Sequence, residues 1–144
     1  MLTVNDLMTV DPTTVKETDS LMTVIGRMKR EGCRQLPVVD AANKLVGMIT
    51  DRDLRLAINT PLVTSQVIDQ IGVLKQLSAE SIMTPDPVST QPDESAKTVA
   101  TLLATYKFGA LPVIENGVLV GIISVTDYLE FFASLPESIL QSAE

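Results

Sequence analysis

Residues 45–50 of this chain read LVGMIT and are followed by Asp53, and residues 119–124 read LVGIIS and are followed by Asp127. Each run is short and almost entirely apolar, which is typical of a strand that is covered on both faces. A hydroxyl side chain ends each strand, and a carboxylate follows three residues later, where a helix is expected to begin. The sequence therefore contains two copies of the same predicted strand, each followed by the start of a helix.

The repeat extends over most of the chain. LMTVDP at residues 7–12 returns as IMTPDP at residues 82–87, and LPVVD at residues 36–40 returns as LPVIE at residues 111–115. These pairs are 75 positions apart, whereas the two runs quoted first are 74 positions apart. A deletion between two apolar runs is what a hairpin turn tolerates. Two copies are too few for a solenoid, so the sequence predicts one pseudo-symmetric globule.

Both copies predict a short N-terminal strand, a helix, two strands and a second helix. In the first copy Asp19 or Ser20 caps the first helix, the strands cover residues 35–40 and 45–50, and the second helix begins at Asp51. The apolar residues at helical spacing, which are expected to be buried, are Leu21, Val24, Ile25, Met28, Leu54, Ala57 and Ile58.

In the second copy Glu94 or Ser95 caps the first helix, and the strands cover residues 110–114 and 118–124. Asn116-Gly117 between these strands is a strong signal for a two-residue hairpin turn. The apolar stripes of the two helices are Val99, Leu102, Leu103 and Tyr106, then Tyr128, Leu129 and Phe132. Residues 59–79 are expected to contain a linking helix, with Val67, Ile68, Ile71, Leu74 and Leu77 on its apolar side.

Composition excludes several classes of protein. The chain has 144 residues, a single cysteine (Cys33), no histidine and a net charge of −7. Residues 61–144 hold three basic and ten acidic side chains, which argues against nucleic acid as the main partner. No apolar run approaches the ~20 residues of a membrane span, and the acidic N-terminus is unlike a signal peptide. We expect a soluble, cytoplasmic protein.

The spaced motifs M-T-x-x-P, L-P-V-[VI]-[DE] and G-[MI]-I-[TS]-x-x-D, present twice in tandem, resemble a pair of CBS domains, also called a Bateman module. The resemblance covers nearly the whole chain. It implies an α/β (α+β) fold in which each repeat has a short three-stranded sheet packed with two helices. The expected boundaries are repeat 1 at residues 1–60, a linker with a helix at 61–79, and repeat 2 at 80–144.

Thr50 with Asp53, and Ser124 with Asp127, are the residues most suggestive of a binding site. A helix N-terminus presents free N–H groups and partial positive charge to a phosphate, and a carboxylate there accepts two hydrogen bonds from the vicinal hydroxyls of a ribose. The alternative is that each pair is a capping box and nothing more. Occurrence in both copies of a CBS-like pattern favours the nucleotide interpretation.

The resemblance implies composite sites between the repeats. One would combine Met48, Thr50 and Asp53 with Thr84, Val88, Phe108 and Gly109. The other would combine Ile122, Ser124 and Asp127 with Thr9, Thr13, Cys33 and Arg34. Val88 and Phe108 would contact the base.

Arg34 and Arg52 are the candidate phosphate ligands, and their counterparts Gly109 and Thr126 are uncharged, so the two sites are expected to be unequal. Asp51 and Asp53 make weak evidence for a dedicated metal site, and we predict none; Mg²⁺ would arrive only with ATP. Cys33 is either a redox sensor or a buried residue beside the ligand, and the absence of histidine favours the second role.

The sequence therefore predicts a stand-alone regulatory CBS pair that binds AMP, ADP or ATP, with NAD or S-adenosylmethionine less favoured. It would need no cofactor, form a homodimer and modulate an effector protein, acting as an energy sensor. The alternative is a homodimerisation or protein-interaction module without a ligand. An enzyme is disfavoured because the chain has neither histidine nor a paired nucleophile and base.

Overall fold

The structure is a computed structural model that describes residues 1–58 and 67–142. The chain forms two compact units, each described by itself below. Unit 1 consists of Met1–Asp11, Ser89–Glu115 and Val120–Glu144, and unit 2 consists of Pro12–Val88 and Asn116–Leu119. These units differ from the sequence repeats, because the N-terminal segment of each repeat joins the sheet built by the other repeat.

Unit 2 is built on a four-stranded sheet in the order β2-β3-β4-β5. Its central strands β3 (Gln35–Val39) and β4 (Leu45–Thr50) form an antiparallel hairpin. At the edges, β2 (Val15–Lys16) pairs with β3 in parallel, and β5 (Thr84–Pro85) pairs with β4 antiparallel. Thus β5, which the sequence assigns to the second repeat, adds a fourth strand to the sheet of the first.

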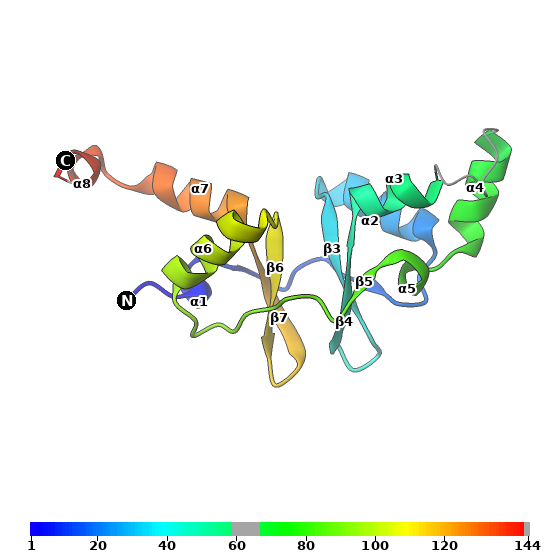
Figure 1. Cartoon of the computed structure of the whole chain (residues 1–144), viewed down its shortest axis with the longest axis horizontal. Helices are drawn as coiled ribbons and strands as arrows, with labels where there is room; N and C mark the ends of the chain where they lie inside the picture. The colour runs from blue at the N-terminus through cyan, green and yellow to red at the C-terminus, as the bar shows by residue number, and fades with distance from the viewer. Residues whose placement is uncertain (59–66, 143–144) are drawn as a thin grey trace. The chain divides into compact units, whose positions relative to one another are not determined.

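In the described residues of unit 2 the helices are α2 (Leu21–Glu31), α3 (Asp51–Ile58), α4 (Val67–Gln76) and α5 (Ala79–Ile82) (Figure 1). The side chain of Ser20 caps α2 by accepting a hydrogen bond from the Thr23 N–H (3.2 Å), and Gly32 ends the helix with a φ of 65°. Such a left-handed residue is what Gly supplies at a helix C-terminus. The predicted stripe is confirmed as buried at Leu21, Val24, Met28 and Leu54, whereas its other members pack against this core but are only partly buried: Ile25, Ala57 and Ile58.

Unit 1 contains a three-stranded sheet in the order β1-β7-β6. β6 (Ala110–Glu115) and β7 (Val118–Ser124) are joined by Asn116 and Gly117, whose φ angles of 54° and 80° confirm the predicted turn. β1 (Thr9–Val10) pairs antiparallel with β7. The helices of unit 1 are α1 (Val4–Leu7), α6 (Ala96–Tyr106), α7 (Val125–Ser134) and α8 (Glu137–Ser142) (Figure 1).

Part of the predicted core of unit 1 is wrong. Val99 and Leu103 of α6 are buried, but Tyr106 is 65% exposed, because it ends its helix and Lys107 follows as a left-handed C-cap. On α7, Leu129 is 62% and Phe132 58% exposed. Tyr128 packs against the core cluster of this unit, whereas α7 has no buried residue.

The short helices α1 and α5 were not predicted, and each directly precedes a Met-Thr pair. The predicted linking helix is confirmed from Val67 to Gln76, whereas residues 59–66 lie outside the described part of the chain, as do the side chains of Val67 and Ile68. Leu74 of this helix is buried, but Ile71 is 38% exposed. No helix in the described ranges is both long and apolar enough to span a membrane.

Candidate functional site

Each unit contains the predicted hydroxyl–carboxylate pair at a helix N-terminus. In unit 2 the Thr50 N–H donates to Asp53 Oδ2 (2.9 Å), and the Asp53 N–H donates to Thr50 Oγ1 (3.1 Å). In unit 1 the Ser124 N–H donates to Asp127 Oδ2 (2.8 Å), and the Asp127 N–H donates to Ser124 Oγ (3.1 Å). Both pairs are therefore capping boxes, and in each box one carboxylate oxygen is left over for another partner.

The remaining oxygens differ between the two boxes. Asp127 Oδ1 accepts a hydrogen bond from the hydroxyl of Thr9 (3.3 Å). Asp53 Oδ1 has no hydrogen-bond partner among the residues that the structure describes. An ionised carboxylate has about four acceptor positions, so both carboxylates have capacity to bind hydroxyl groups beyond their capping role.

A short strand from the other repeat pairs with the strand that leads into each capping box. In unit 1 Thr9 of β1 is paired with Ile122 of β7, and in unit 2 Thr84 of β5 is paired with Met48 of β4. The side chains of Thr9 and Thr84 are exposed. Each box is therefore bordered by a threonine from the Met-Thr motif of the other repeat.

Two glycines allow these short strands to approach, and sequence reasoning assigned them no role. A Cβ atom on Gly121 would lie 2.8 Å from Met8 Sδ and 2.9 Å from the Thr9 carbonyl oxygen. At Gly47 the same atom would meet the side chain of Met83 and would lie 3.0 Å from the Thr84 carbonyl oxygen. A glycine repeated inside two otherwise apolar strands was the available signal, because such glycines mark close backbone approach.

The predicted site residues are divided between the two units. Unit 2 holds Met48, Thr50, Asp53, Thr84, Val88, Thr13, Cys33, Arg34 and Arg52, and unit 1 holds Thr9, Phe108, Gly109, Ile122, Ser124 and Asp127. The combination of residues from different units in one site stays a prediction. Of the two predicted base-contacting residues, Val88 is 50% exposed, and Phe108 is partly buried and stacks on Tyr106 with ring centroids 5.7 Å apart.

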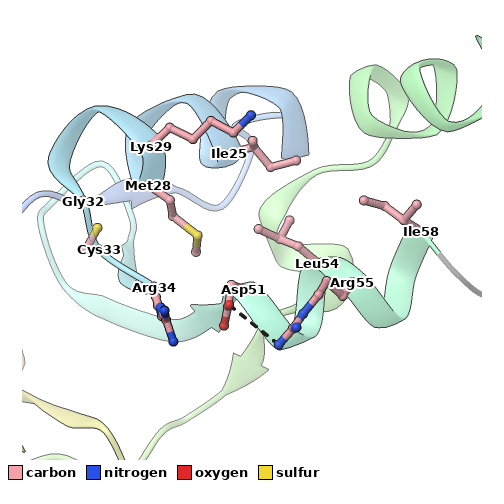
Figure 2. A pocket seen from close by; sticks show the side chains of 10 residues that line it. All are labelled: Ile25, Met28, Lys29, Gly32, Cys33, Arg34, Asp51, Leu54, Arg55 and Ile58. Carbon is pink, nitrogen blue, oxygen red and sulfur yellow. Dashed lines mark ion pairs between the residues drawn. The ribbon is translucent and has the colours of Figure 1, made fainter. Parts of the chain in front are cut away.

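A separate pocket of about 450 Å³ lies between α2 and α3 in unit 2 (Figure 2). Figure 2 shows α2 along one side of the pocket and α3 along the other. Its lining residues are Ile25, Met28, Lys29, Gly32, Cys33, Arg34, Asp51, Leu54, Arg55 and Ile58. The pocket includes Cys33 and Arg34 from the predicted site but neither Thr50 nor Asp53, so it is a different cavity from the one the sequence predicts.

The charges at the pocket are mostly positive. Lys29, Arg34 and Arg55 line it together with a single carboxylate, Asp51, which forms an ion pair of 3.7 Å with Arg55. In the described part of the chain, the guanidinium groups of Arg34 and Arg52 form no hydrogen bond or ion pair and are exposed. Both are therefore available to an anionic ligand.

Cys33 is a partly buried free thiol. Burial raises its pKa above the ordinary value of 9.0, more than the hydrogen bonds from the Gln35 and Cys33 backbone lower it. A protonated thiol is a poor nucleophile, which favours the packing role over a redox role. Within residues 1–58 and 67–142, no group of three or more histidine, cysteine or acidic side chains is arranged to hold a metal ion.

Comparison with known proteins identifies the family. The CBS domain model matches residues 4–60 and 79–134. A CBS domain-containing protein of Dictyostelium discoideum is 30% identical over 137 residues, which are 94% of each chain. Other relatives are longer: the chain covers 21% of the inosine-5'-monophosphate dehydrogenase of Bifidobacterium longum, to which it is 34% identical over 129 residues.

Solved structures of similar proteins support the same family. The structure of AcuB from Vibrio cholerae has a TM-score of 0.81 and 30% identity, covering 100% of this chain and 98% of that one. The structure of CBSX2, a CBS-pair protein from Arabidopsis thaliana, in complex with AMP has a TM-score of 0.79 and 27% identity, covering 94% and 99%. The two family matches together span most of the described fold, and the chain belongs to the CBS domain family as a tandem pair of CBS domains.

Proposed function

We propose that this CBS pair binds an adenosine nucleotide at the Thr50–Asp53 and Ser124–Asp127 capping boxes and, by doing so, regulates a partner protein. The observation that carries the proposal is the hydrogen bond from the Thr9 hydroxyl to Asp127 Oδ1 (3.3 Å). It demonstrates that a box carboxylate accepts a hydroxyl from outside its own helix. The AMP complex of CBSX2, a relative with 27% identity, supports adenosine as the ligand class.

The ribose would be held by the carboxylates. Asp53 Oδ1 is open to a hydroxyl in the described structure, and Asp127 Oδ1 would exchange the Thr9 hydroxyl for one from the ligand. Hydrogen bonds to charged groups contribute about 1.5–3 kcal/mol each. The N-termini of α3 and α7 would favour the phosphate through their unpaired N–H groups and partial positive charge.

The two sites would differ in their preference for phosphates. Arg34 and Arg52 are exposed and unpaired in the described structure, whereas the counterpart positions hold Gly109 and Thr126. Bidentate contacts from arginine to phosphate are among the stronger charge-assisted hydrogen bonds. Arg34 and Arg52 would therefore favour ADP and ATP over AMP where they reach the ligand, and Mg²⁺ would enter with ATP only.

Regulation would follow from differential affinity. A ligand shifts a conformational equilibrium only as far as it binds one arrangement better than the other. The effector would be a separate polypeptide that reads this shift and so responds to cellular energy charge. Because the chain contains no histidine, we propose a regulatory role and no catalysis.

Isothermal titration with AMP, ADP and ATP, each with and without Mg²⁺, tests the proposal. Asp53→Ala and Asp127→Ala should each weaken binding about tenfold or more at one site. The matched control is Asp6→Ala, because the Thr3–Asp6 pair of α1 is a third capping box outside the candidate site. Asp6→Ala should leave the affinity unchanged, which separates loss of a cap from loss of a ligand contact.

Two outcomes would contradict these roles. Equal affinity in the wild type and the Asp53→Ala/Asp127→Ala double variant would remove the ribose role of the carboxylates. Arg34→Ala should reduce the affinity for ATP more than the affinity for adenosine, and an equal loss for both ligands would exclude Arg34 as a phosphate ligand. No heat with any of the three nucleotides would favour the alternative of a module without a nucleotide ligand.

A further inference from the structure

The short edge strands β1 and β5 are each preceded by a methionine. Met8 and Met83 stand directly before these two-residue strands, whose own side chains are exposed. The Met8 N–H donates to the Val4 carbonyl oxygen (2.8 Å), and the Met83 N–H donates to the Ala79 carbonyl oxygen (2.9 Å). Each methionine therefore caps the end of a short helix, α1 or α5, and joins that helix to an edge strand.

Each methionine packs on its sheet at a glycine. A Cβ atom on Gly121 would lie 2.8 Å from Met8 Sδ, and one on Gly47 would lie 2.9 Å from Met83 Cγ. Real Cβ atoms do not approach a neighbour so closely, so each methionine fills the space that a side chain at the glycine would occupy. Both methionines also pack against the hydrophobic core of their unit. They supply apolar packing at the sheet edges that the exposed side chains of β1 and β5 do not.

The methionines of the chain differ in exposure. Met28 and Met48 are buried, with 6% and 8% of their surface exposed, whereas Met1 is 96% exposed. Met8 and Met83 lie between these limits, since both are partly exposed. A small reagent in water therefore reaches Met8 and Met83 more readily than the two buried methionines.

We propose that Met8 and Met83 are oxidation sites at which hydrogen peroxide loosens β1 and β5. A lone pair of the thioether sulfur attacks one peroxide oxygen, and the O–O bond breaks as the S–O bond forms. The other oxygen takes up the proton of the transferred hydroxyl group and leaves as water, so the sulfur loses two electrons and the peroxide gains them. The product is a polar sulfoxide, which methionine sulfoxide reductases return to the thioether.

A sulfoxide fits neither of the places open to it. If it stays over the glycine, its oxygen lies against the apolar core, where a polar group without a hydrogen-bond partner is unfavourable. If it turns toward water, the space over the glycine is left empty and its apolar packing is lost. Either change weakens the attachment of an edge strand that has only two residues.

The consequence for the candidate site rests on the proposed function. The residue after each methionine is the threonine that borders a capping box. The Thr9 hydroxyl donates to Asp127 Oδ1 (3.3 Å), and Thr84 pairs with Met48 of the strand that leads into Thr50. Loosening of β1 and β5 would therefore alter the border of both boxes and lower the affinity for nucleotide. The chain would then respond to peroxide as well as to nucleotide.

Peroxide treatment followed by peptide mass spectrometry and urea unfolding tests the oxidation sites without nucleotide. One added oxygen should appear on Met1, Met8 and Met83 before it appears on Met28 and Met48. The urea midpoint should fall by about 0.5 M or more once Met8 and Met83 are modified. Reduction of the unfolded protein by methionine sulfoxide reductases A and B, followed by refolding, should restore it. Earlier modification of Met28 and Met48, or a midpoint that stays unchanged or is not restored, overturns the proposal.

Leucine variants assign the effect to the two side chains. Met8→Leu/Met83→Leu keeps apolar groups of similar volume and no thioether at these positions, so peroxide should leave its midpoint unchanged. Met22→Leu is the matched control, because Met22 is also partly exposed and packs against the unit 2 core, but lies within α2. After peroxide treatment this control should lose as much as the wild type. A double variant that loses as much as the wild type overturns the proposal.

Titration with AMP, ADP and ATP before and after oxidation tests the consequence for the site. The affinity of the wild type for the nucleotide that binds should fall about tenfold or more, whereas Met8→Leu/Met83→Leu should keep its affinity. Equal affinity of the wild type before and after oxidation overturns the link between these methionines and the site. If the unoxidised protein binds no nucleotide, the proposed function fails, and the urea midpoints alone still decide whether Met8 and Met83 are the oxidation sites.

Discussion

Substitution of Gly121 by alanine tests how the edge strand β1 is held beside the candidate site. Gly121 pairs with Val10 across the β1–β7 ladder. The new Cβ atom would lie 2.8 Å from Met8 Sδ and 2.9 Å from the Thr9 carbonyl oxygen. The methionine side chain can rotate away, but the carbonyl oxygen moves only if the backbone of β1 moves.

The magnitude follows from two opposing effects. Overpacking of this kind costs about 1–3 kcal/mol, and replacement of glycine by alanine returns about 0.5–1 kcal/mol by reducing the freedom of the unfolded chain. We therefore expect a net loss of about 1–2 kcal/mol in the free energy of unfolding. With a urea m-value of about 2 kcal/mol/M, the middle of the usual range, the unfolding midpoint should fall by about 0.5–1 M. Displacement of Thr9 should also break its hydrogen bond to Asp127.

Urea unfolding followed by circular dichroism measures this loss, and Gly26→Ala is the matched control. Gly26 lies within α2, where an added Cβ meets no atom within 4 Å. Alanine should stabilise the protein there by about 0.5–1 kcal/mol through helix propensity. If Gly121→Ala raises the midpoint as Gly26→Ala does, β1 does not need the close approach, and the reasoning about the glycine is refuted.

Three further predictions each concern one side chain. Tyr128→Phe should lower the free energy of unfolding by about 0.5–1.5 kcal/mol, since the Tyr128 hydroxyl donates to the Ala96 carbonyl oxygen (2.7 Å); an unchanged urea midpoint would contradict this. Asp40→Ala should lower the free energy of unfolding by about 1–3 kcal/mol, because Asp40 Oδ1 accepts hydrogen bonds from the N–H groups of Ala42 (2.9 Å) and Lys44 (3.0 Å) in the β3–β4 turn. Asp40→Asn keeps an acceptor oxygen and should lower it less. Burial raises the pKa of Cys33, so the native state keeps the thiol proton to a higher pH than the unfolded chain does, and the free energy of unfolding should fall as pH rises through and above 9.0. In Cys33→Ser this part of the pH dependence should disappear. At pH 8, iodoacetamide should label the thiol of the native protein more slowly than that of the unfolded protein.

Several secondary-structure elements could be predicted from the local pattern of residues in the sequence. The strand at residues 45–50 and the strand at 118–124 have the predicted bounds, because apolar residues, turn signals and length all agree there. Of the two cap candidates offered for each first helix, the serine is the one that caps, at Ser20 and at Ser95. Asn116-Gly117 specified its turn because the turn requires positive φ at both positions.

Other features depend on information that a local pattern does not contain. Helical spacing placed Tyr106, Leu129 and Phe132 on apolar stripes, but it does not state whether a partner covers the stripe, and all three are exposed. The helices α1 and α5 have four residues each, which is too short for periodicity to reveal. The α2–α3 pocket arises from the sizes of side chains that meet only after folding.

For the candidate site, too, the sequence predicted the local contacts but not those between distant residues. The boxes at Asp53 and Asp127 were identified because both their bonds are local in sequence. The contact of Thr9 with Asp127 joins residues 118 positions apart, and the residues alone did not predict that hydrogen bond. The family resemblance placed the two residues in one site but specified neither atoms nor distance.

The exchange of β1 and β5 between the two sheets determines whether one repeat can fold without the other. Each repeat sends its Met-Thr strand to the sheet built from the other repeat, so a polypeptide with one repeat would leave one sheet edge bare and one strand without a ladder. Two such polypeptides would complete each other only by exchanging strands between molecules. Joining both copies in one gene makes that exchange intramolecular and hence independent of protein concentration. A cut between residues 60 and 80 therefore separates the repeats but breaks both sheets, and neither half is expected to fold alone.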